Sequence, residues 1–361
     1  MNDRQPNVDC VVGLQYGSEA KGLVCQTLAD KYQLAVRVGG PNAGHTVRWT
    51  SPGGNRAEFK ARHIPATVLN RDCTLALAAG ALITPQVLDE EIALLDSYGI
   101  DVRGRLIVDP NACVIQDRHI AAEHEKKEGS DLNDKIGSTR EGVGAALAER
   151  VLRRGGTTLA YQEPYLHPYV EQGRRVCDVI RSTPRVLIEA SQGCLLSNLH
   201  GPYPYATSRD TNVSGALAEC GVPPHAVRNV IGVFRTYPIR VAGRSGPTLG
   251  RETTWDALSI KLGKAVSEKT TVTKRIRRVF DFSMEEFQYA CTLNRPTILA
   301  LTFLNYLNAA DEGVTEFDKL SKESREFIDN AEAVAQCPVL LMSTSADTVV
   351  IRPELDVLLP V

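Results

Sequence analysis

The sequence predicts an α/β protein with a large, mostly parallel central sheet flanked by helices. Apolar runs rich in β-branched residues alternate with helical patterns along the 361 residues. The first apolar run passes directly into a glycine-rich loop and then a helix. Strands that alternate with helices usually pair in parallel through crossover connections. We therefore expect residues 1–361 to form a single domain with loop and helical insertions, including a helical insertion at about 110–182.

The N-terminal βαβ unit is the clearest part of this pattern. It consists of a strand at 8–14, a loop at 17–22, a helix, a second strand at 34–38 and a second loop at 39–46. A loop of this kind presents backbone N–H groups to a phosphate, and Lys21 adds a positive charge. Glycine follows this lysine where the P-loop pattern requires Ser or Thr, so a plain P-loop NTPase is disfavoured. The simpler alternative is two ordinary βα turns that use glycine for positive φ.

The later elements are predicted from local composition. A helix at 84–97 starts with Thr84 and Pro85, a favourable N-cap and first-turn pair, and stops at Gly99. Residues 51–57 contain proline and glycine and predict a hairpin-like insert. Apolar runs predict further strands at 74–79, 105–109, 185–190, 227–237 and 297–303. Amphipathic or alanine-rich patterns predict further helices at 116–128, 142–154, 211–220 and 251–264.

Composition and charge exclude several classes of function. A net charge of −2 gives no electrostatic basis for binding nucleic acid or an anionic membrane. No apolar run approaches the length of a membrane span, and the polar first residues do not resemble a signal sequence. The nine cysteines form no C-x-x-C pair, and most are interpreted as buried free thiols. We expect a cytoplasmic protein, in the host cytoplasm if it is viral, that binds small molecules.

The two glycine-rich loops carry a family resemblance. Residues 17–22 read G-S-E-A-K-G, and residues 42–46 read N-A-G-H-T. Together they resemble the signatures of the adenylosuccinate synthetase family, G-D-E-G-K-G and N-A-G-H-T. The resemblance covers nearly the whole chain. It implies a P-loop-related fold and a ligase that joins L-aspartate to the 6-position of a purine monophosphate.

The resemblance also implies how this chemistry is done. Oxide is a poor leaving group, so the 6-oxygen is first phosphorylated by a nucleoside triphosphate, with Mg²⁺ across the phosphates. His45 would donate to the transferring phosphate, Lys21 would support the triphosphate, and Ser18 and Gly44 stand at the metal positions. The family's catalytic aspartate is Ser18 here, and a neutral hydroxyl is a poorer base. As an alternative, a glycine-flanked histidine such as His45 often only makes a hydrogen bond within a turn.

A third motif points to the purine monophosphate. Residues 136–139 read I-G-S-T and resemble the family's I-G-T-T, which holds the 5′-phosphate, although Ser138 and Thr139 could also be simple helix caps. Arg153 matches an arginine that in the family crosses a two-fold interface, which implies a homodimer; taken alone, it suits a helix C-terminus. The residues implied for the monophosphate are Ser18, Asn42, Ser138, Thr139, Arg153, Gln192, Leu196, Thr207 and Arg275.

Residues 268–278 form a basic segment that resembles the family's T-T-G-R-R-R-R loop, which closes over L-aspartate and the sugar. A charge run is more often only a solvated face. Arginine suits the contact because its planar fork matches a carboxylate. The residues implied for L-aspartate are Thr271, Val272, Thr273, Arg275 and Arg277.

The phosphate donor is predicted from residues 302–305, which read T-F-L-N where the family has T-K-L-D. The family's aspartate accepts hydrogen bonds from guanine, whereas the Asn305 amide has both a donor and an acceptor and can match adenine. Phe303 offers a stacking face. ATP or dATP is therefore the expected donor. The implied residues are Gly17, Ser18, Glu19, Ala20, Lys21, Gly22, Gly44, His45, Thr46, Asn305, Ser343, Ser345 and Ala346. The last three belong to residues 340–346, which resemble a C-terminal loop that lies beside the donor base in the family.

The change at Ser18 indicates either lost activity or a changed substrate. We favour a changed substrate because most other motif positions match. A serine leaves room and a partner beside ring N1 for a 2-amino group, as in the PurZ-type branch of the family. That branch acts on dGMP, with L-aspartate, to give 2-amino-2′-deoxy-N6-succinyladenylate for 2-aminoadenine DNA in certain viruses. The alternatives are an ordinary synthetase that uses IMP and GTP, and a non-catalytic purine-nucleotide-binding protein.

Overall fold

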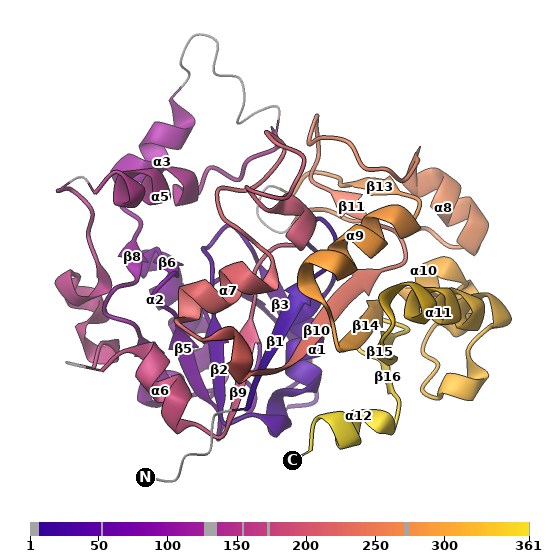
Figure 1. Cartoon of the computed structure of the whole chain (residues 1–361), viewed down its shortest axis with the longest axis horizontal. Coiled ribbons are helices and arrows are strands. Elements are labelled where there is room, and N and C mark those ends of the chain that lie inside the picture. The colour runs from indigo at the N-terminus through magenta and orange to yellow at the C-terminus, as the bar shows by residue number, and fades with distance from the viewer. Residues whose placement is uncertain are drawn as a thin grey trace.

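A nine-stranded sheet runs through the centre of the computed structural model, which describes residues 7–51, 53–125, 136–153, 155–171, 174–270 and 274–360 (Figure 1). In spatial order the strands are β16 (Val349–Ile351), β15 (Val339–Ser343), β14 (Ile298–Thr302), β10 (Val227–Arg235), β1 (Asn7–Gly13), β9 (Arg185–Glu189), β2 (Leu34–Arg37), β5 (Thr74–Leu77) and β7 (Leu106–Val108). Neighbours are parallel except β15 with β16. The predicted fold class is confirmed.

Helices cover both faces of this sheet because its strands are apolar on both sides. In β1, Cys10 and Val12 pack on one face and Val11 on the other, as the two-residue period of a strand requires. The first face is covered by α6 (Val176–Ser182), α7 (Val213–Cys220), α9 (Met284–Asn294) and α11 (Lys322–Ala335). The second face is covered by α1 (Lys21–Thr27), α2 (Pro85–Ser97) and α12 (Glu354–Leu358).

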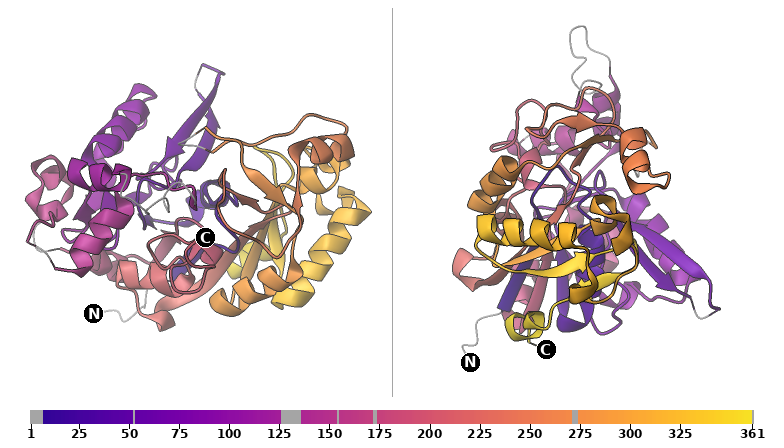
Figure 2. Two further views of the ribbon diagram at one scale, coloured as in Figure 1. Left: turned by 90° about the horizontal axis from the view of Figure 1, so that it is seen from above. Right: turned by 90° about the vertical axis from the view of Figure 1, so that its right-hand side faces the viewer.

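Smaller elements surround one end of the sheet. The strands β3 (His45–Thr50) and β4 (Arg56–Ala61) form an antiparallel hairpin that projects from the body of the molecule (Figure 2). Between β7 and β9 lie α3 (Asp117–His124) and α5 (Val143–Val151), and β8 (Cys113–Val114) pairs there with β6 (Leu82–Ile83). Further along the chain are β11 (Ile239–Arg240), β12 (Glu252–Thr253), β13 (Arg278–Phe280), α8 (Trp255–Leu262) and α10 (Leu304–Leu307).

Several predicted boundaries differ from the structure; the helix predicted at 116–128, for example, ends at His124. The helix expected at 251–264 begins only at Trp255, because Glu252 and Thr253 pair with β13 and the Thr254 side chain caps the helix by accepting from the Ala257 N–H. The segment expected as a C-terminal loop at 340–346 is mostly strand, since β15 extends to Ser343. The helix at 84–97 forms as predicted, although the Thr84 side chain makes no cap hydrogen bond.

The parallel order brings several loops to one edge of the sheet. The carboxyl ends of β1, β2, β9, β10 and β14 all leave the sheet at this edge, and ligands of open parallel sheets bind there.

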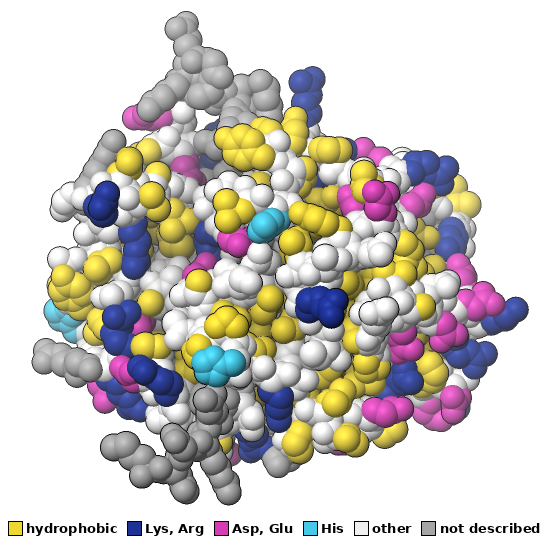
Figure 3. Space-filling view, in the orientation of Figure 1, with side chains coloured by type: hydrophobic (Ala, Val, Ile, Leu, Met, Phe, Trp, Pro, Cys, Tyr) yellow, Lys and Arg dark blue, Asp and Glu magenta, His cyan; other side chains and the backbone are white. Residues whose placement is uncertain are grey.

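On the face of the molecule shown in Figure 3, basic and acidic side chains are interspersed. Within the described residues, none of the helices has the length and apolar character that crossing a bilayer requires. All nine cysteines are free, as predicted.

Candidate active site

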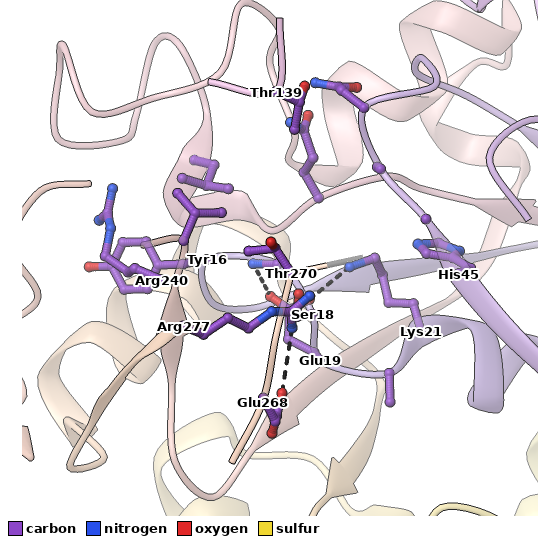
Figure 4. A pocket seen from close by; sticks show the side chains of 18 of the residues that line it. Tyr16, Ser18, Glu19, Lys21, His45, Thr139, Arg240, Glu268, Thr270 and Arg277 are labelled. Carbon is purple, nitrogen blue, oxygen red and sulfur yellow. Dashed lines mark hydrogen bonds and ion pairs between the residues drawn. The ribbon is translucent and has the colours of Figure 1, made fainter. Parts of the chain in front are cut away.

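A cavity of about 760 Å³ opens at the carboxyl ends of the central strands. Its walls come from the loop after β1, the segment 42–46 after β2, and the loop after β9. The start of α5, residues 205–208, residues 267–270, Lys274 and Arg277 complete it from the other sides. Figure 4 shows side chains from these segments converging on one space, with Ser18 and Lys21 near its centre and His45 and Thr139 at its margins.

The loop after β1 is held in shape by a buried carboxylate. Glu19 is fully buried, and its Oε1 accepts the Gly17 N–H at 2.7 Å and the Gln15 N–H at 3.2 Å. The Lys21 ammonium donates to the other oxygen at 2.7 Å. Ser18 has φ 60° and lies exposed in the cavity. Glu19 therefore orders the loop, and Ser18 presents its side chain to the cavity.

The imidazole of His45 is held in place by two buried side chains, Glu189 and Arg37. Its Nδ1 contacts the Glu189 carboxylate, and the Arg37 guanidinium lies 2.9 Å from the same nitrogen. Burial lowers the pKa of His45 to about 4, and the Arg37 charge acts in the same direction. Burial opposes ionisation of Glu189, but Arg37 and the histidine outweigh it, so the pKa of Glu189 is below its ordinary value. His45 is thus neutral at pH 7, with its other ring nitrogen left for the cavity.

We expect an NMR titration of ¹³C-labelled histidine to show His45 titrating near pH 4 in the ligand-free, magnesium-free protein. The histidine pKa is lowered on folding. The unfolded chain therefore takes up this proton preferentially as the pH falls from 6.5 to 4, and His45 makes folding less favourable through that window. His45→Asn assigns the signal. A midpoint near 6.5 would contradict the burial of this ring.

The cavity wall beyond these loops is polar. The Gln192 amide donates to Thr207 Oγ1 at 2.8 Å, and its carbonyl oxygen Oε1 is buried with no hydrogen-bond partner in the described part of the chain. Ser138 and Thr139 line the same wall. The N-terminus of α5, however, is capped by Glu123, whose carboxylate accepts the N–H groups of Gly142 and Gly144 at 2.8 Å. These helix N–H groups are therefore already engaged within the protein.

Arginine side chains close the opposite wall. Glu268 lies in the cavity wall between Arg235 and Arg277, and it pairs with both guanidinium groups. Burial lowers the pKa of Arg277 from its ordinary value, which Glu268 opposes. This wall therefore offers the Arg277 guanidinium to the cavity, while Arg235 lies buried behind it and contacts the loop that contains Ser18.

Comparison with known sequences identifies the family of this chain. A family model described as "Adenylosuccinate synthetase" matches residues 10–164 and 157–312. The chain belongs to the adenylosuccinate synthetase family. The synthetase of Methanocaldococcus jannaschii is 36% identical over 355 residues, covering 96% of this chain and 97% of its own, and that of Thermococcus sibiricus is 35% identical over 341 residues. The protein is therefore an enzyme, a ligase that forms a carbon–nitrogen bond.

Solved structures of the family agree with this fold. The succinoaminodeoxyadenylate synthetase (PurZ) of cyanophage S-2L, bound to dGMP and to dATP as an energy donor, superposes with a TM-score of 0.79 at 30% identity over 99% of both chains. The fully ligated adenylosuccinate synthetase of Plasmodium falciparum superposes with a TM-score of 0.80 at 21% identity over 96% of this chain and 100% of its own. The second likeness supports the fold alone.

The cavity brings together most side chains that the family motifs imply. It includes the predicted residues Gly17, Ser18, Glu19, Ala20, Lys21, Gly22, Asn42, Gly44, His45, Thr46, Ser138, Thr139, Gln192, Leu196, Thr207, Arg277, Ser343, Ser345 and Ala346. Thr271, Val272 and Thr273 lie outside the described residues.

Three implied residues do not line this cavity. Arg153 follows the C-terminal end of α5 and is exposed, whereas the other end of that helix faces the cavity. Arg275 is also exposed, and its backbone N–H donates to Thr270 Oγ1 at 3.0 Å. Asn305 is buried on α10, and its amide donates to Glu312 at 2.8 Å. The donor half of the Asn305 amide is thus already engaged within the protein.

Other cavity residues were not predicted from the motifs. Tyr16 donates a hydrogen bond to Glu286, and the Arg240 guanidinium lies 4.3 Å from the centre of its ring. Burial raises the pKa of Tyr16 well above its ordinary value, so it stays a hydrogen-bond donor. Arg235 does not line the cavity itself: it is fully buried behind the wall, at the end of β10. A charge that ends an apolar strand was the signal available for Arg235, and Tyr16 sits directly before the glycine-rich loop.

Proposed function

We propose that the enzyme joins L-aspartate to the 6-position of dGMP, using ATP or dATP, and forms 2-amino-2′-deoxy-N6-succinyladenylate, a nucleoside diphosphate and phosphate. The observation that carries the proposal is Ser18, a neutral side chain presented to the cavity where the family has its catalytic aspartate. The PurZ structure bound to dGMP and dATP, which this chain matches along its length, supports the same substrates. The product would serve the synthesis of 2-aminoadenine DNA.

The first step in this proposal is transfer of the γ-phosphoryl group to the 6-oxygen of dGMP. Lys21, fixed by Glu19, places a positive charge beside the triphosphate. His45 borders the space where the 6-oxygen would lie, and binding of anionic phosphates would raise its pKa and favour the protonated ring as a donor. Ser18 leaves room for the 2-amino group beside ring N1.

Magnesium would be held mainly by the phosphates. The described residues include no group of three or more His, Cys, Asp or Glu that could hold a metal ion. Near the loop the chain offers the Ser18 hydroxyl and the Gly44 carbonyl, while the Glu19 carboxylate is already engaged. Such a sparse set of oxygen donors fits Mg²⁺, which usually keeps waters and binds through substrate phosphates. When bound, the ion would neutralise charge on the transferring phosphoryl group.

In the second step, L-aspartate would displace the 6-phosphoryl group. Arg277 is the aspartate contact that the cavity supports best, because it lines the wall beside Ser18 and keeps a partly buried guanidinium there. Arg275 is exposed in this structure, so its proposed contact requires its side chain to turn toward the cavity.

A homodimer is the proposed assembly. Arg153 is exposed at the far end of α5 from this chain's cavity, so it can reach a phosphate only in a second copy. Val151 and Leu152 beside it are 74% and 56% exposed, which would suit an interface.

The nine free cysteines fit the cytoplasmic location expected from the sequence.

Substrate pairs test the proposal directly. Turnover would be measured with dGMP or IMP, each with ATP, dATP or GTP, and L-aspartate, by following phosphate release and the succinyl product. We expect dGMP with ATP or dATP to be the productive pair. Turnover of IMP with GTP alone would identify an ordinary synthetase instead. Binding of dGMP and ATP without phosphate release would favour a non-catalytic role.

A further inference from the structure

Arg235 joins the segments that form the cavity. It is the last residue of β10, and its side chain has no exposed surface. The Gln15 side chain makes two hydrogen bonds with the Arg235 backbone. Gln15 Oε1 accepts the Arg235 N–H at 3.0 Å, and Gln15 Nε2 donates to the Arg235 carbonyl at 3.0 Å. Gln15 belongs to the loop that continues into Ser18. The position of Arg235 is therefore fixed relative to the start of that loop.

The guanidinium group contacts the same loop again and two further segments. Its Nη1 donates to the Ser18 carbonyl at 3.0 Å, which ties down the middle of the loop after β1. Nη1 and Nη2 both donate to the Glu268 carboxylate, which also contacts Arg277. The Phe303 ring lies 3.9 Å from the guanidinium carbon, and Phe303 has a left-handed backbone with φ 61°.

Each of these segments faces the cavity and has a different proposed ligand. Ser18 faces the purine, Glu268 and Arg277 border the L-aspartate loop, and Phe303 with Ser343 borders the base of the phosphate donor. The Phe303 N–H donates to Ser343 Oγ at 3.0 Å, which links the two residues that border this position. A single buried guanidinium thus lies among all three proposed ligand positions.

We propose that Arg235 is a positioning residue that couples binding of the phosphate donor to binding of L-aspartate. Binding of the phosphate donor fixes the Phe303 ring, which holds the Arg235 guanidinium in place. The guanidinium in turn fixes the Glu268 carboxylate, and Glu268 positions the Arg277 side chain for L-aspartate. The coupling rests on the proposed function for the identity of its ligands. A planar guanidinium group can stack on an aromatic ring and donate two N–H groups to a carboxylate at the same time. A lysine ammonium cannot do both, so lysine cannot replace Arg235.

The test measures this coupling directly. Isothermal titration calorimetry gives the Kd of L-aspartate for the full-length enzyme saturated with dGMP and Mg²⁺, with and without a non-hydrolysable ATP analogue. The ratio of the two Kd values is the coupling factor, and it is the same in whichever order the ligands bind. We expect a ratio of at least about 5 for the unmodified enzyme. In Arg235→Lys the ratio should fall to about 1, since lysine keeps the positive charge but lacks the planar guanidinium group.

Arg228 supplies a matched control. It lies on the same strand, β10, and its guanidinium pairs with the buried Asp9, near the start of that strand. Arg228→Lys also weakens a partly buried ion pair and should lower thermal stability, while its coupling factor stays at the unmodified value. An unchanged ratio in Arg235→Lys, an equal loss in Arg228→Lys, or no coupling in the unmodified enzyme would each overturn the proposal.

The two proposals fail in different ways. If dGMP does not bind but IMP does, the proposed substrate is wrong, and the same coupling measurement proceeds with IMP and a non-hydrolysable GTP analogue. If dGMP binds and turns over while Arg235→Lys keeps the full coupling factor, the substrate proposal survives and the role of Arg235 is wrong.

Discussion

Lys21→Met is expected to lower kcat by about 10²- to 10³-fold, because it removes a preorganised positive charge from the transferring phosphoryl group. It should also lower the free energy of unfolding. Lys21 and Glu19 are 2% and 0% exposed, so the variant leaves a buried carboxylate without its cation, a loss of about 3 to 5 kcal/mol. The lower end is expected, since Glu19 keeps two backbone N–H donors. Steady-state kinetics and chemical denaturation measure the two effects separately.

The double variant Glu19→Gln, Lys21→Met separates catalysis from folding. Both backbone N–H groups donate to Glu19 Oε1, and the glutamine carbonyl oxygen can still accept them. The glutamine has no charge to leave unpaired, so stability should recover most of the loss. Activity should stay low because the ammonium is still missing. Recovery of kcat together with stability would show that Lys21 has only a structural role.

Local sequence patterns were sufficient for the elements that form the site. The run at 8–14 followed by Gly17 and Lys21 defines a strand, a turn and a helix through contacts close in the chain, and the structure has β1 and α1 there. Parallel pairing then follows from the alternation of strands and helices. The start of α8 was misplaced because a long-range pairing, β12 with β13, claimed Glu252 and Thr253.

Side-chain partners that are distant in the sequence could not be predicted in this way. The motif located Asn305, but its direction depends on Glu312, which pairs with its amide. The N–H groups at the start of α5 are taken by Glu123, from a different helix. The contacts of Arg235 with Glu268 and Phe303 exist only once three loops meet at the sheet edge. Family motifs identify such residues by position, whereas their hydrogen bonds depend on tertiary packing.

Ser18→Asp is expected to reverse the choice of purine, lowering kcat/KM for dGMP relative to IMP by at least about tenfold, or 1.4 kcal/mol. The backbone should tolerate the change, because Ser18 has φ 60° and aspartate adopts the left-handed region more readily than most residues. The larger carboxylate would fill the space proposed for the 2-amino group. It would also restore a base for the N1 proton. Parallel kinetics with the two monophosphates give the ratio.

Ser18→Asn and Ser18→Ala separate size from charge at this position. Asparagine has nearly the shape of aspartate without its charge, so it should lose dGMP turnover through crowding and gain no IMP turnover, since it cannot act as a base. Alanine keeps the space and removes the hydroxyl, so any loss with dGMP reports the hydrogen bond alone. If all three variants keep the dGMP-to-IMP ratio of the unmodified enzyme, Ser18 does not contact the purine ring. The substrate preference would then have to come from other residues of the cavity wall.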